Sequence, residues 1–584
     1  MNFYKILTAT TLAFSSYSLA EALRYEAEAA IPADDHNAEA VADANASGGK
    51  YVEMGSGNLL FDIEMPSEGY YTLYVNYKLP TDRGSKTQNL TLNGSSAGQV
   101  TFGVSDEFSK IKAAGKIKLA KGKNTIGIEK SWGWVGIDYI EITEFEATPW
   151  DISPKPVTPE PTESAQKLYN FLLANFGKRT ISGVMTNDVM ATDGKYTPLD
   201  YTNQTELKYI RDASGKNVVL VGFDFLHATG KNSEGEWYRG YTHGALEMAK
   251  TVWKAGGIPQ FNWHWKDPSH SIEAFYTQSG DKSSYTEFSI NLAYDPETKK
   301  WKTDSDEYKA IVRDIEIIAD SLLTLQKEGV AALWRPLHEA SGKWFWWGTD
   351  GASSCVALYK LMFDIFVNKK GLHNLIWVWT TDEAPDALDW YPGDEYVDVV
   401  GRDYYYYPRE SNHASLISSF EKVKDIYGAK KIVTLSENGS VPYPDEMKAD
   451  GANWSWFMPW YGDYAMESWA NDNNAESWNT VMNNSYTITL EDMPGWDKYE
   501  IQQTTVNAMA KRNAPTLLFD GKTLQLNLGQ TSAKVSVYDL QGNRILVKNM
   551  SGDKSLDLSQ LAHGKYMVKV NGSGISAVQP ILIK

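Results

Sequence analysis

Hydrophobic and polar positions alternate along the first part of the chain. Between about Leu23 and Glu144 the alternation comes in short stretches, such as residues 69–77 and 124–129, which glycine and asparagine interrupt. A period of two residues is typical of strands with one buried face. Many such strands over about 120 residues predict a β-sandwich (jelly-roll) module at residues 21–146.

The pattern changes beyond residue 164. Short, continuous apolar runs now alternate with longer stretches of helical periodicity, such as residues 308–327 and 355–368. Continuous apolar runs are typical of parallel strands that are buried on both faces. Eight runs are present, at residues 180–186, 218–225, 258–265, 332–339, 375–381, 398–405, 431–438 and 454–460. Eight buried strands with intervening helices predict a (β/α)8 TIM barrel at residues 164–513.

Three further segments complete the predicted organisation. Residues 1–20 hold a lysine, an apolar run and a small-residue cleavage site, which together predict a secretory signal peptide. Residues 147–163 contain five prolines and predict a semi-rigid linker. Residues 514–584 return to short strands and predict a small all-β C-terminal domain. Because no later stretch is long and apolar enough to cross a membrane, we expect an exported protein without a membrane span.

Composition narrows the range of partners. The 584-residue chain has a net charge of −18, which argues against a nucleic-acid partner. Its one cysteine, Cys355, excludes internal disulfides and cysteine-based zinc sites. The chain also has 21 Trp and 34 Tyr. These side chains have flat apolar faces with a polar edge, so their abundance favours a carbohydrate partner and a large aromatic core about equally.

Two of the predicted barrel strands carry a glutamate at their ends, Glu339 and Glu437. Reactive groups of TIM barrels lie at the C-terminal ends of the strands. Two carboxylates that face each other there can lie about 5–5.5 Å apart, the spacing of retaining glycosidases. Aromatic residues 344–347 follow Glu339, and an apolar wall raises a carboxyl pKa, as an acid/base requires. A tyrosine hydroxyl at the end of residues 398–405 is expected to hold Glu437 ionised.

Residues 334–347 resemble the acid/base segment of glycoside hydrolase family 26, whose members are mostly β-mannanases. The resemblance extends over roughly residues 164–512 and includes Ile181-Ser182-Gly183, the Gly-x-Asp-x-Tyr motif at 401–405, and Ser436-Glu437. It implies that Glu339 is the acid/base, that Glu437 is the nucleophile, and that catalysis needs no cofactor. The residues that match the family's substrate contacts are His264, His338, Trp344, Tyr405 and Trp460.

The two flanking domains also resemble known families. Residues 25–28, 48–52 and 132–140 are similar to carbohydrate-binding modules of family 35. That resemblance implies a structural Ca²⁺ held by Glu26, Glu28 and Asp138, and it makes Trp134 a candidate sugar platform. Residues 537–542 and 561–566 resemble the C-terminal sorting domain of the type IX secretion route. This resemblance implies that the secretion machinery is a partner of the C-terminal domain. It also implies a location outside or on the surface of a Gram-negative cell.

The leading hypothesis is a secreted, retaining endo-β-1,4-mannanase that hydrolyses plant mannan, glucomannan or galactomannan with two glutamates. An alternative within the same fold is a β-glycanase that acts on mixed-linkage β-glucan or β-1,3-xylan. A second alternative is a non-catalytic glycan-binding adhesin. A metal-dependent barrel hydrolase is disfavoured because the first strand lacks His-x-His and the chain has only nine histidines. The sequence leaves open endo or exo action, the preferred mannan, the ligand of the N-terminal module, the oligomeric state, and removal of the C-terminal domain.

Overall fold

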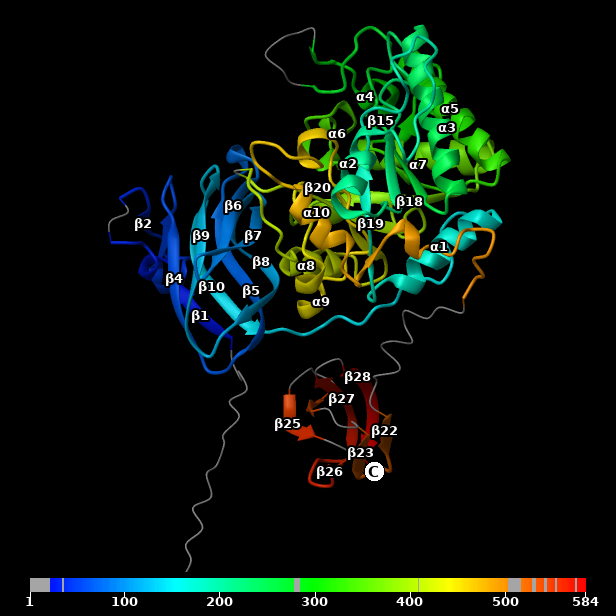
Figure 1. Cartoon of the computed structure of the whole chain (residues 1–584). Coiled ribbons are helices and arrows are strands. Elements are labelled where there is room, and N and C mark those ends of the chain that lie inside the picture. Colours follow the sequence, from blue (N-terminus) through cyan, green and yellow to red (C-terminus); the bar gives the residue numbers. More distant parts are fainter. Residues whose placement is uncertain are drawn as a thin grey trace, which may run out of the picture. The chain divides into compact units, whose positions relative to one another are not determined.

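The computed structural model describes residues 22–33, 36–277, 284–407, 409–502, 516–527, 532–539, 544–551, 554–572 and 575–583 (Figure 1). The predicted signal peptide lies outside these residues. The chain divides into two compact units, with the boundary between Phe145 and Glu146.

The first unit is a sandwich of two antiparallel sheets. One sheet has the order β2-β3-β10-β5-β8 with β1 beside β10, and the other has the order β4-β9-β6-β7. The strands are β1 (Leu23–Glu26), β2 (Glu39–Ala42), β3 (Lys50–Glu53), β4 (Leu59–Met65), β5 (Gly69–Leu79), β6 (Lys86–Leu92), β7 (Ser95–Phe102), β8 (Ser105–Leu119), β9 (Gly122–Trp132) and β10 (Gly136–Glu144). Buried and exposed residues alternate strictly along β4, as the sequence pattern predicts for a strand with one face on the core. The predicted β-sandwich is confirmed.

The second unit is built on a parallel sheet of the TIM type. Its strands run in the order β12-β13-β14-β17-β18-β19-β20. They are β12 (Gly183–Met185), β13 (Leu220–Asp224), β14 (Ile258–Asn262), β17 (Ala332–Arg335), β18 (Leu375–Thr381), β19 (Val399–Tyr404) and β20 (Ile432–Asn438), while β11 (Thr180–Ile181) pairs with β21 (Thr487–Ile488). The eighth predicted run, residues 454–460, lies between the two edges of the sheet: Leu435 N–H donates to Trp456 O (3.1 Å), and Met185 N–H donates to Pro459 O (3.0 Å).

Helices lie between these strands along the chain. They are α1 (Glu163–Asn175), α2 (Thr205–Ser214), α3 (Glu236–Lys254), α4 (Ile290–Ala293), α5 (Asp306–Lys327), α6 (Trp346–Thr349), α7 (Ala352–Phe363), α8 (Ile417–Ile426), α9 (Pro444–Asp450) and α10 (Ala475–Met482), and a small hairpin of β15 (Tyr294–Asp295) and β16 (Lys300–Trp301) precedes α5. Every residue of β18 is buried, as expected for a parallel strand under a helical layer.

Much of the aromatic content belongs to the barrel core. Ten tryptophans are less than 2% exposed: Trp263, Trp265, Trp334, Trp346, Trp347, Trp377, Trp379, Trp454, Trp456 and Trp478. Trp263 and Trp265 stack on each other with ring centroids 4.0 Å apart. The abundance of tryptophan therefore reflects packing first, and the aromatic residues that are not fully buried remain candidates for sugar binding.

The proline-rich segment at residues 147–163 is attached to the barrel along its length. The Trp150 ring packs edge-on against Phe176, with centroids 4.9 Å apart. Farther along, Val157 N–H donates to the Asp398 carboxylate (2.7 Å). The prolines keep the segment extended, as expected for a linker, but the apolar residues between them find partners on the barrel surface. The segment is thus an outer strap of the barrel.

The C-terminal region is all-β, as predicted. It has a three-stranded antiparallel sheet, β22-β23-β26, and a four-stranded one, β25-β24-β27-β28. The strands are β22 (Thr516–Phe519), β23 (Thr523–Asn527), β24 (Ser532–Tyr538), β25 (Arg544–Ser551), β26 (Lys554–Asp557), β27 (Gly564–Gly572) and β28 (Ile575–Ile583). Leu524, Val535 and Val568 lie in its own small core.

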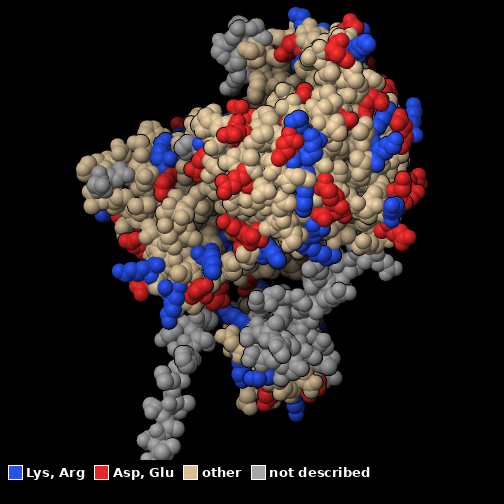
Figure 2. All heavy atoms as spheres, in the orientation of Figure 1, with Lys and Arg blue, Asp and Glu red and all other residues tan. Residues whose placement is uncertain are grey.

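The surface charge and the lengths of the helices are relevant to the predictions about nucleic-acid binding and membrane spans. On the face that Figure 2 shows, Lys and Arg are interspersed with Asp and Glu and do not gather into one basic patch. Among the residues that the structure describes, no helix has the length and apolar character needed to span a membrane.

Candidate active site

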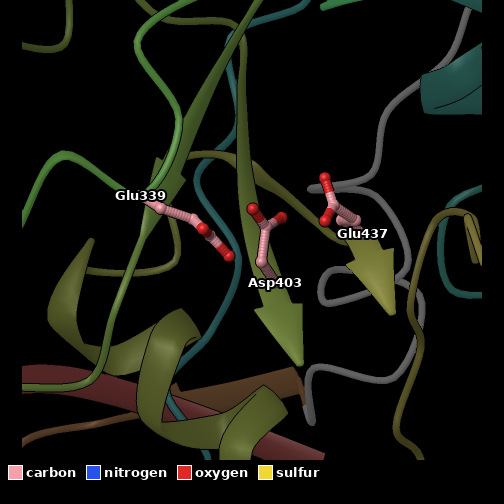
Figure 3. A group of neighbouring side chains, drawn as sticks. All are labelled: Glu339, Asp403 and Glu437. Carbon is pink, nitrogen blue, oxygen red and sulfur yellow. The ribbon is translucent and has the colours of Figure 1, made fainter. Parts of the chain in front are cut away.

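Two glutamates and an aspartate meet at the C-terminal ends of three strands of one sheet, β17, β19 and β20 (Figure 3). Glu437 lies near the end of β20, Asp403 lies in β19, and Glu339 follows β17. One carboxylate oxygen from each lies within 4.8 Å of the other two. The backbone at Leu337 and Glu339 is left-handed, with φ of 51° and 53°, so the regular strand stops before Glu339. The predicted pairing of Glu339 with Glu437 is therefore present in the geometry.

A fully buried arginine, Arg335, holds this cluster together. Its guanidinium donates to Asn262 Oδ1 (3.1 Å), Thr380 Oγ1 (3.0 Å), Asp403 Oδ2 (2.8 Å) and Glu437 Oε2. A buried cation is stable only when it is paired and hydrogen-bonded, and these partners from four other strands meet that need. Arg335 was not predicted as a site residue, and Asp403 was expected only as part of the motif at residues 401–405. An arginine inside a continuous apolar run was the signal that it must face a carboxylate.

The second oxygen of Glu437 is held by a tyrosine. The Tyr405 hydroxyl donates to Glu437 Oε1 (2.7 Å). Burial, and then the charge of Glu437, raise the pKa of Tyr405 well above its ordinary value, so the hydroxyl remains a donor. The expected contact between a tyrosine at the end of residues 398–405 and Glu437 is confirmed. With both oxygens engaged, the Glu437 carboxylate has a fixed orientation.

The surroundings of the two glutamates differ electrically. Burial raises the pKa of Glu339 well above its ordinary value, and the charges of Asp403 and Glu437 raise it further. Burial also raises the pKa of Glu437, but the charge of Arg335 and the hydrogen bond from Tyr405 oppose that rise. Of the two carboxyls, Glu339 therefore has the stronger tendency to hold a proton, and Glu437 has the stronger tendency to stay ionised.

Two histidines lie beside the glutamates in a buried chain. His338 Nε2 is 3.2 Å from His264 Nε2, and His264 Nδ1 is 2.5 Å from Asp224 Oδ2. Burial, with the nearby His264 and Arg335, lowers the pKa of His338 well below its ordinary value, so this ring is neutral. Asp224 was not predicted, although it is the last residue of β13, within the second apolar run of the barrel. The contact with Asp224 fixes the orientation of the His264 ring, and the His264 ring in turn fixes the orientation of His338.

The aromatic residues after Glu339 have two different roles. Trp344 is 44% exposed, whereas Trp346 and Trp347 are fully buried. The indole N–H of Trp347 donates to His338 O (2.9 Å), so this residue supports the site from behind. Across the site, the half-buried Trp460 ring lies 5.5 Å from the His264 ring. Of the expected aromatic wall, Trp344 is the tryptophan that solvent, and hence a ligand, can reach.

The trio of acidic side chains also has the ligand types of a metal site. It is, within the described part of the chain, the one set of three acidic or histidine side chains whose ligand atoms lie that close together. Arg335 already binds two of the three carboxylates and supplies the positive charge that they require. The donor set therefore fits a protein cation rather than a metal ion.

The predicted calcium ligands of the N-terminal module gather around Ser47. The Ser47 hydroxyl donates to Glu26 Oε1 (2.7 Å), and its backbone N–H donates to Asp138 Oδ1 (2.9 Å). Glu26 Oε2 and Glu28 Oε2 are buried with no hydrogen-bond partner. Burial and the charges of Glu26 and Glu28 raise the pKa of Asp138 to about 6. Unpaired carboxylate oxygens in a group of like charges fit a bound cation such as Ca²⁺.

The candidate sugar platform of the module is accessible. Trp134 is 53% exposed, and Trp132, at the end of β9, is 66% exposed. Gly133, between the two, has a φ of 74°, a conformation that glycine adopts without strain. Two exposed indole rings thus occupy one turn of the sandwich.

The barrel and its paired carboxylates define a glycoside hydrolase. Comparison with known sequences assigns the family: residues 157–492, more than half of the chain, match the model of glycosyl hydrolase family 26, and the chain belongs to this family. Residues 23–145 match carbohydrate binding module family 35, and residues 521–584 match the secretion system C-terminal sorting domain. Mannanases of family 26 need no catalytic cofactor.

Relatives with known names match more than three quarters of the chain. A mannan endo-1,4-β-mannosidase of Thermothelomyces thermophilus is 31% identical over 481 residues, which cover 81% of this chain and 91% of that protein. A mannan endo-1,4-β-mannosidase B of Piromyces is 32% identical over 469 residues, which cover 78% and 74%.

Solved structures of mannanases are also similar to this chain. A β-mannanase from a symbiotic protist of the termite Reticulitermes speratus is 43% identical, with a TM-score of 0.53, over 59% of this chain and 99% of that one. The Podospora anserina GH26-CBM35 β-(1,4)-mannanase is 30% identical, with a TM-score of 0.51, over 81% and 99%.

Proposed function

We propose that this protein is a secreted, retaining endo-β-1,4-mannanase that uses Glu339 as the acid/base and Glu437 as the nucleophile. The observation that carries the proposal is the separation of the two glutamates, whose nearest oxygens lie within 4.8 Å. Retaining glycosidases have carboxyl groups about 5–5.5 Å apart, whereas inverting enzymes need about 6.5–9.5 Å to admit a water.

The reaction follows from the two protonation states. Ionised Glu437 attacks the anomeric carbon while protonated Glu339 gives its proton to the departing glycosidic oxygen. The C–O bond breaks, and a covalent glycosyl-enzyme remains on Glu437. Glu339, now a carboxylate, takes a proton from water, and the hydroxide so formed attacks the anomeric carbon and releases Glu437. Two inversions at the anomeric carbon retain its configuration.

The surrounding residues bind and orient the sugar. Tyr405 and Arg335 hold Glu437 in the attacking position. His264, His338, Trp344 and Trp460 are the further substrate contacts in this proposal. Exposed Trp344 offers an apolar face to a sugar ring, and the neutral, fixed His338 offers a hydrogen-bonding edge.

The substrate class comes from the relatives, which are named as mannan endo-1,4-β-mannosidases. We propose plant mannan, glucomannan or galactomannan as substrates. In the module, Trp134 binds glycan, and Glu26, Glu28 and Asp138 bind Ca²⁺. The sorting domain directs secretion through the type IX machinery, which places the enzyme outside or on the surface of a Gram-negative cell.

Product analysis tests both the reaction and the substrate. The purified protein is incubated with mannan, glucomannan, lichenan and β-1,3-xylan, and new reducing ends are followed by ¹H NMR. We expect β-anomers first and a range of manno-oligosaccharides. Initial α-anomers would contradict the retaining mechanism, and release of a single small product would contradict endo action. Cleavage of lichenan or xylan alone would select the alternative substrates, and binding without cleavage would select the adhesin.

A further inference from the structure

A loop beside the active site carries an unusually exposed aromatic residue. Residues 461–474 follow the run that closes the barrel, and Trp469 in this loop is 77% exposed. No other large hydrophobic side chain among the described residues is as exposed. An indole with this much apolar surface in solvent can stack against the apolar face of a sugar ring.

The loop is fixed to the segment that carries the nucleophile. Asn473, which is 1% exposed, donates from Nδ2 to Gly439 O (2.9 Å) and Tyr464 O (2.6 Å). Its Oδ1 accepts from Val441 N–H (3.0 Å). Gly439 is only two residues beyond Glu437, so these bonds hold the loop at the mouth of the barrel.

A continuous series of contacts leads from the nucleophile to Trp469. Tyr405, which binds Glu437, lies with its ring 5.0 Å from the Tyr464 ring. The guanidinium carbon of Arg409 lies 3.8 Å from the centre of the Tyr464 ring and 5.2 Å from that of the Trp469 ring. Trp469 therefore extends the aromatic lining of the site outward.

Arg409 is held firmly enough to act as a support. Its Nε donates to Asp472 Oδ2 (2.6 Å), and its Nη2 donates to Asp463 O (2.8 Å). Asp472 is 3% exposed, so this ion pair is shielded from solvent. A cation over one face of an indole stabilises the ring's position. The high exposure of Trp469 leaves its remaining surface open to solvent.

We propose that Trp469, supported by Arg409, forms a distal sugar-binding position for the polysaccharide chain that the glutamates cleave. The ligand is a neutral, hydroxylated sugar, because the charge of Arg409 is already balanced by Asp472 and the open surface is the apolar indole. This distal position rests on the proposed function. It adds a dependence of activity on the length of the sugar chain. Short oligosaccharides that end before Trp469 do not use this position, whereas longer chains gain affinity from it.

The test compares Trp469→Ala with wild type on manno-oligosaccharides from the trimer to the hexamer and on mannan. We expect kcat/KM on the shortest cleaved oligosaccharide to stay within about twofold, and kcat/KM on the longest to fall by about tenfold, mainly through KM. Trp469→Phe keeps a flat apolar face and should recover most of the loss. Glu467→Ala changes an exposed side chain of the same loop and should have no length-dependent effect.

The outcomes separate this inference from the proposed function. An equal loss on all chain lengths, or no loss on any, overturns the distal position but leaves the mannanase assignment intact. If the wild type cleaves gluco- or xylo-oligosaccharides instead, the same length series on that sugar decides the role of Trp469. If it cleaves none of them, the proposed function and the distal position fail together.

Discussion

Two regions of the molecule each gather three carboxylates, but they balance the negative charge differently. In the barrel, Glu339, Asp403 and Glu437 surround Arg335, which binds two of them directly. In the sandwich, Glu26 and Asp138 accept hydrogen bonds from Ser47, a neutral residue, and the charge of Glu28 also acts on Asp138. The nearby Arg24 is engaged with Glu141 and lies over the Tyr139 ring.

The difference shows how similar side chains serve different chemistry. Arg335 forms ion pairs with Asp403 and Glu437 but not with Glu339, and the pKa of Glu339 is raised, as its proposed role as the acid requires. A cluster without its own cation leaves buried oxygens unpaired and depends on an ion from solution. The first arrangement predicts catalysis without metal, and the second predicts stability that depends on metal.

The largest expected effect comes from removing the Glu437 carboxylate, one of the two that Arg335 binds. Glu437→Ala should form no glycosyl-enzyme on any substrate, and kcat should fall by at least about 10⁴-fold. Steady-state rates and mass spectrometry of trapped intermediate measure this. A variant that still formed the intermediate would show that Glu437 is not the nucleophile.

The second effect depends on the leaving group. Glu339→Ala should lower activity on mannan by about 10²–10⁴-fold, because the departing oxygen loses its proton donor. A β-mannoside of an acidic phenol needs little protonation, so it should give a burst of phenol followed by slow turnover. Azide should replace the missing base and give a β-mannosyl azide. If Glu437→Ala showed the burst instead, the two roles would be reversed.

The third effect concerns stability of the sandwich. At a calcium concentration of 100 times Kd, binding should stabilise residues 22–145 by about 2.7 kcal/mol, seen as a higher Tm than in chelator. Without calcium, stability should fall as pH rises through about 6, where Asp138 loses its proton. Calcium should therefore matter more at pH 7 than at pH 5.

Matched variants make the calcium test specific. Asp138→Asn should abolish the calcium-dependent shift in Tm, whereas Asp62→Asn, which changes an exposed residue of β4, should keep it. An identical Tm with calcium and with chelator would show that the cluster does not bind the ion.

The smallest effect is a shift in pH dependence. In the proposed mechanism the reaction starts from protonated Glu339, so kcat/KM should fall as pH rises through the pKa of that group. The charge of Asp403 helps to raise this pKa. Asp403→Asn should therefore move the alkaline limb of kcat/KM to lower pH by about one unit. Ser436→Ala removes a neutral contact to Asp403 and should leave the limb in place. A shift to higher pH in Asp403→Asn would contradict the electrostatic argument.

Features that depend on a short stretch of the chain could be predicted from the sequence. Each apolar run predicts one strand, and a glutamate at a strand end is visible where it stands. The network of Arg335 was not visible, because its partners Asn262, Thr380, Asp403 and Glu437 come from four other strands and meet it only in the closed sheet. The order of strands was predictable, but the register that sets these contacts was not.

The sequence also could not predict which of its aromatic side chains are buried. Residues 344–347 read as one aromatic run, yet Trp344 is exposed and Trp347 is buried behind His338. Which member of such a run faces solvent depends on the turns that follow β17, where Glu339 and Lys343 both have positive φ. Composition alone therefore could not separate a sugar platform from core packing.

The attachment of residues 147–163 to the barrel changes where the catalytic part begins. A recombinant fragment cut at residue 164 would lose Trp150 and uncover the rings of Phe176 and Phe420 that it packs against. It would also leave the buried Asp398 without the backbone donor from Val157. A protease directed at the proline-rich stretch would likewise find much of its backbone already bound. The smallest soluble catalytic fragment should therefore start near residue 147 and carry the strap with it.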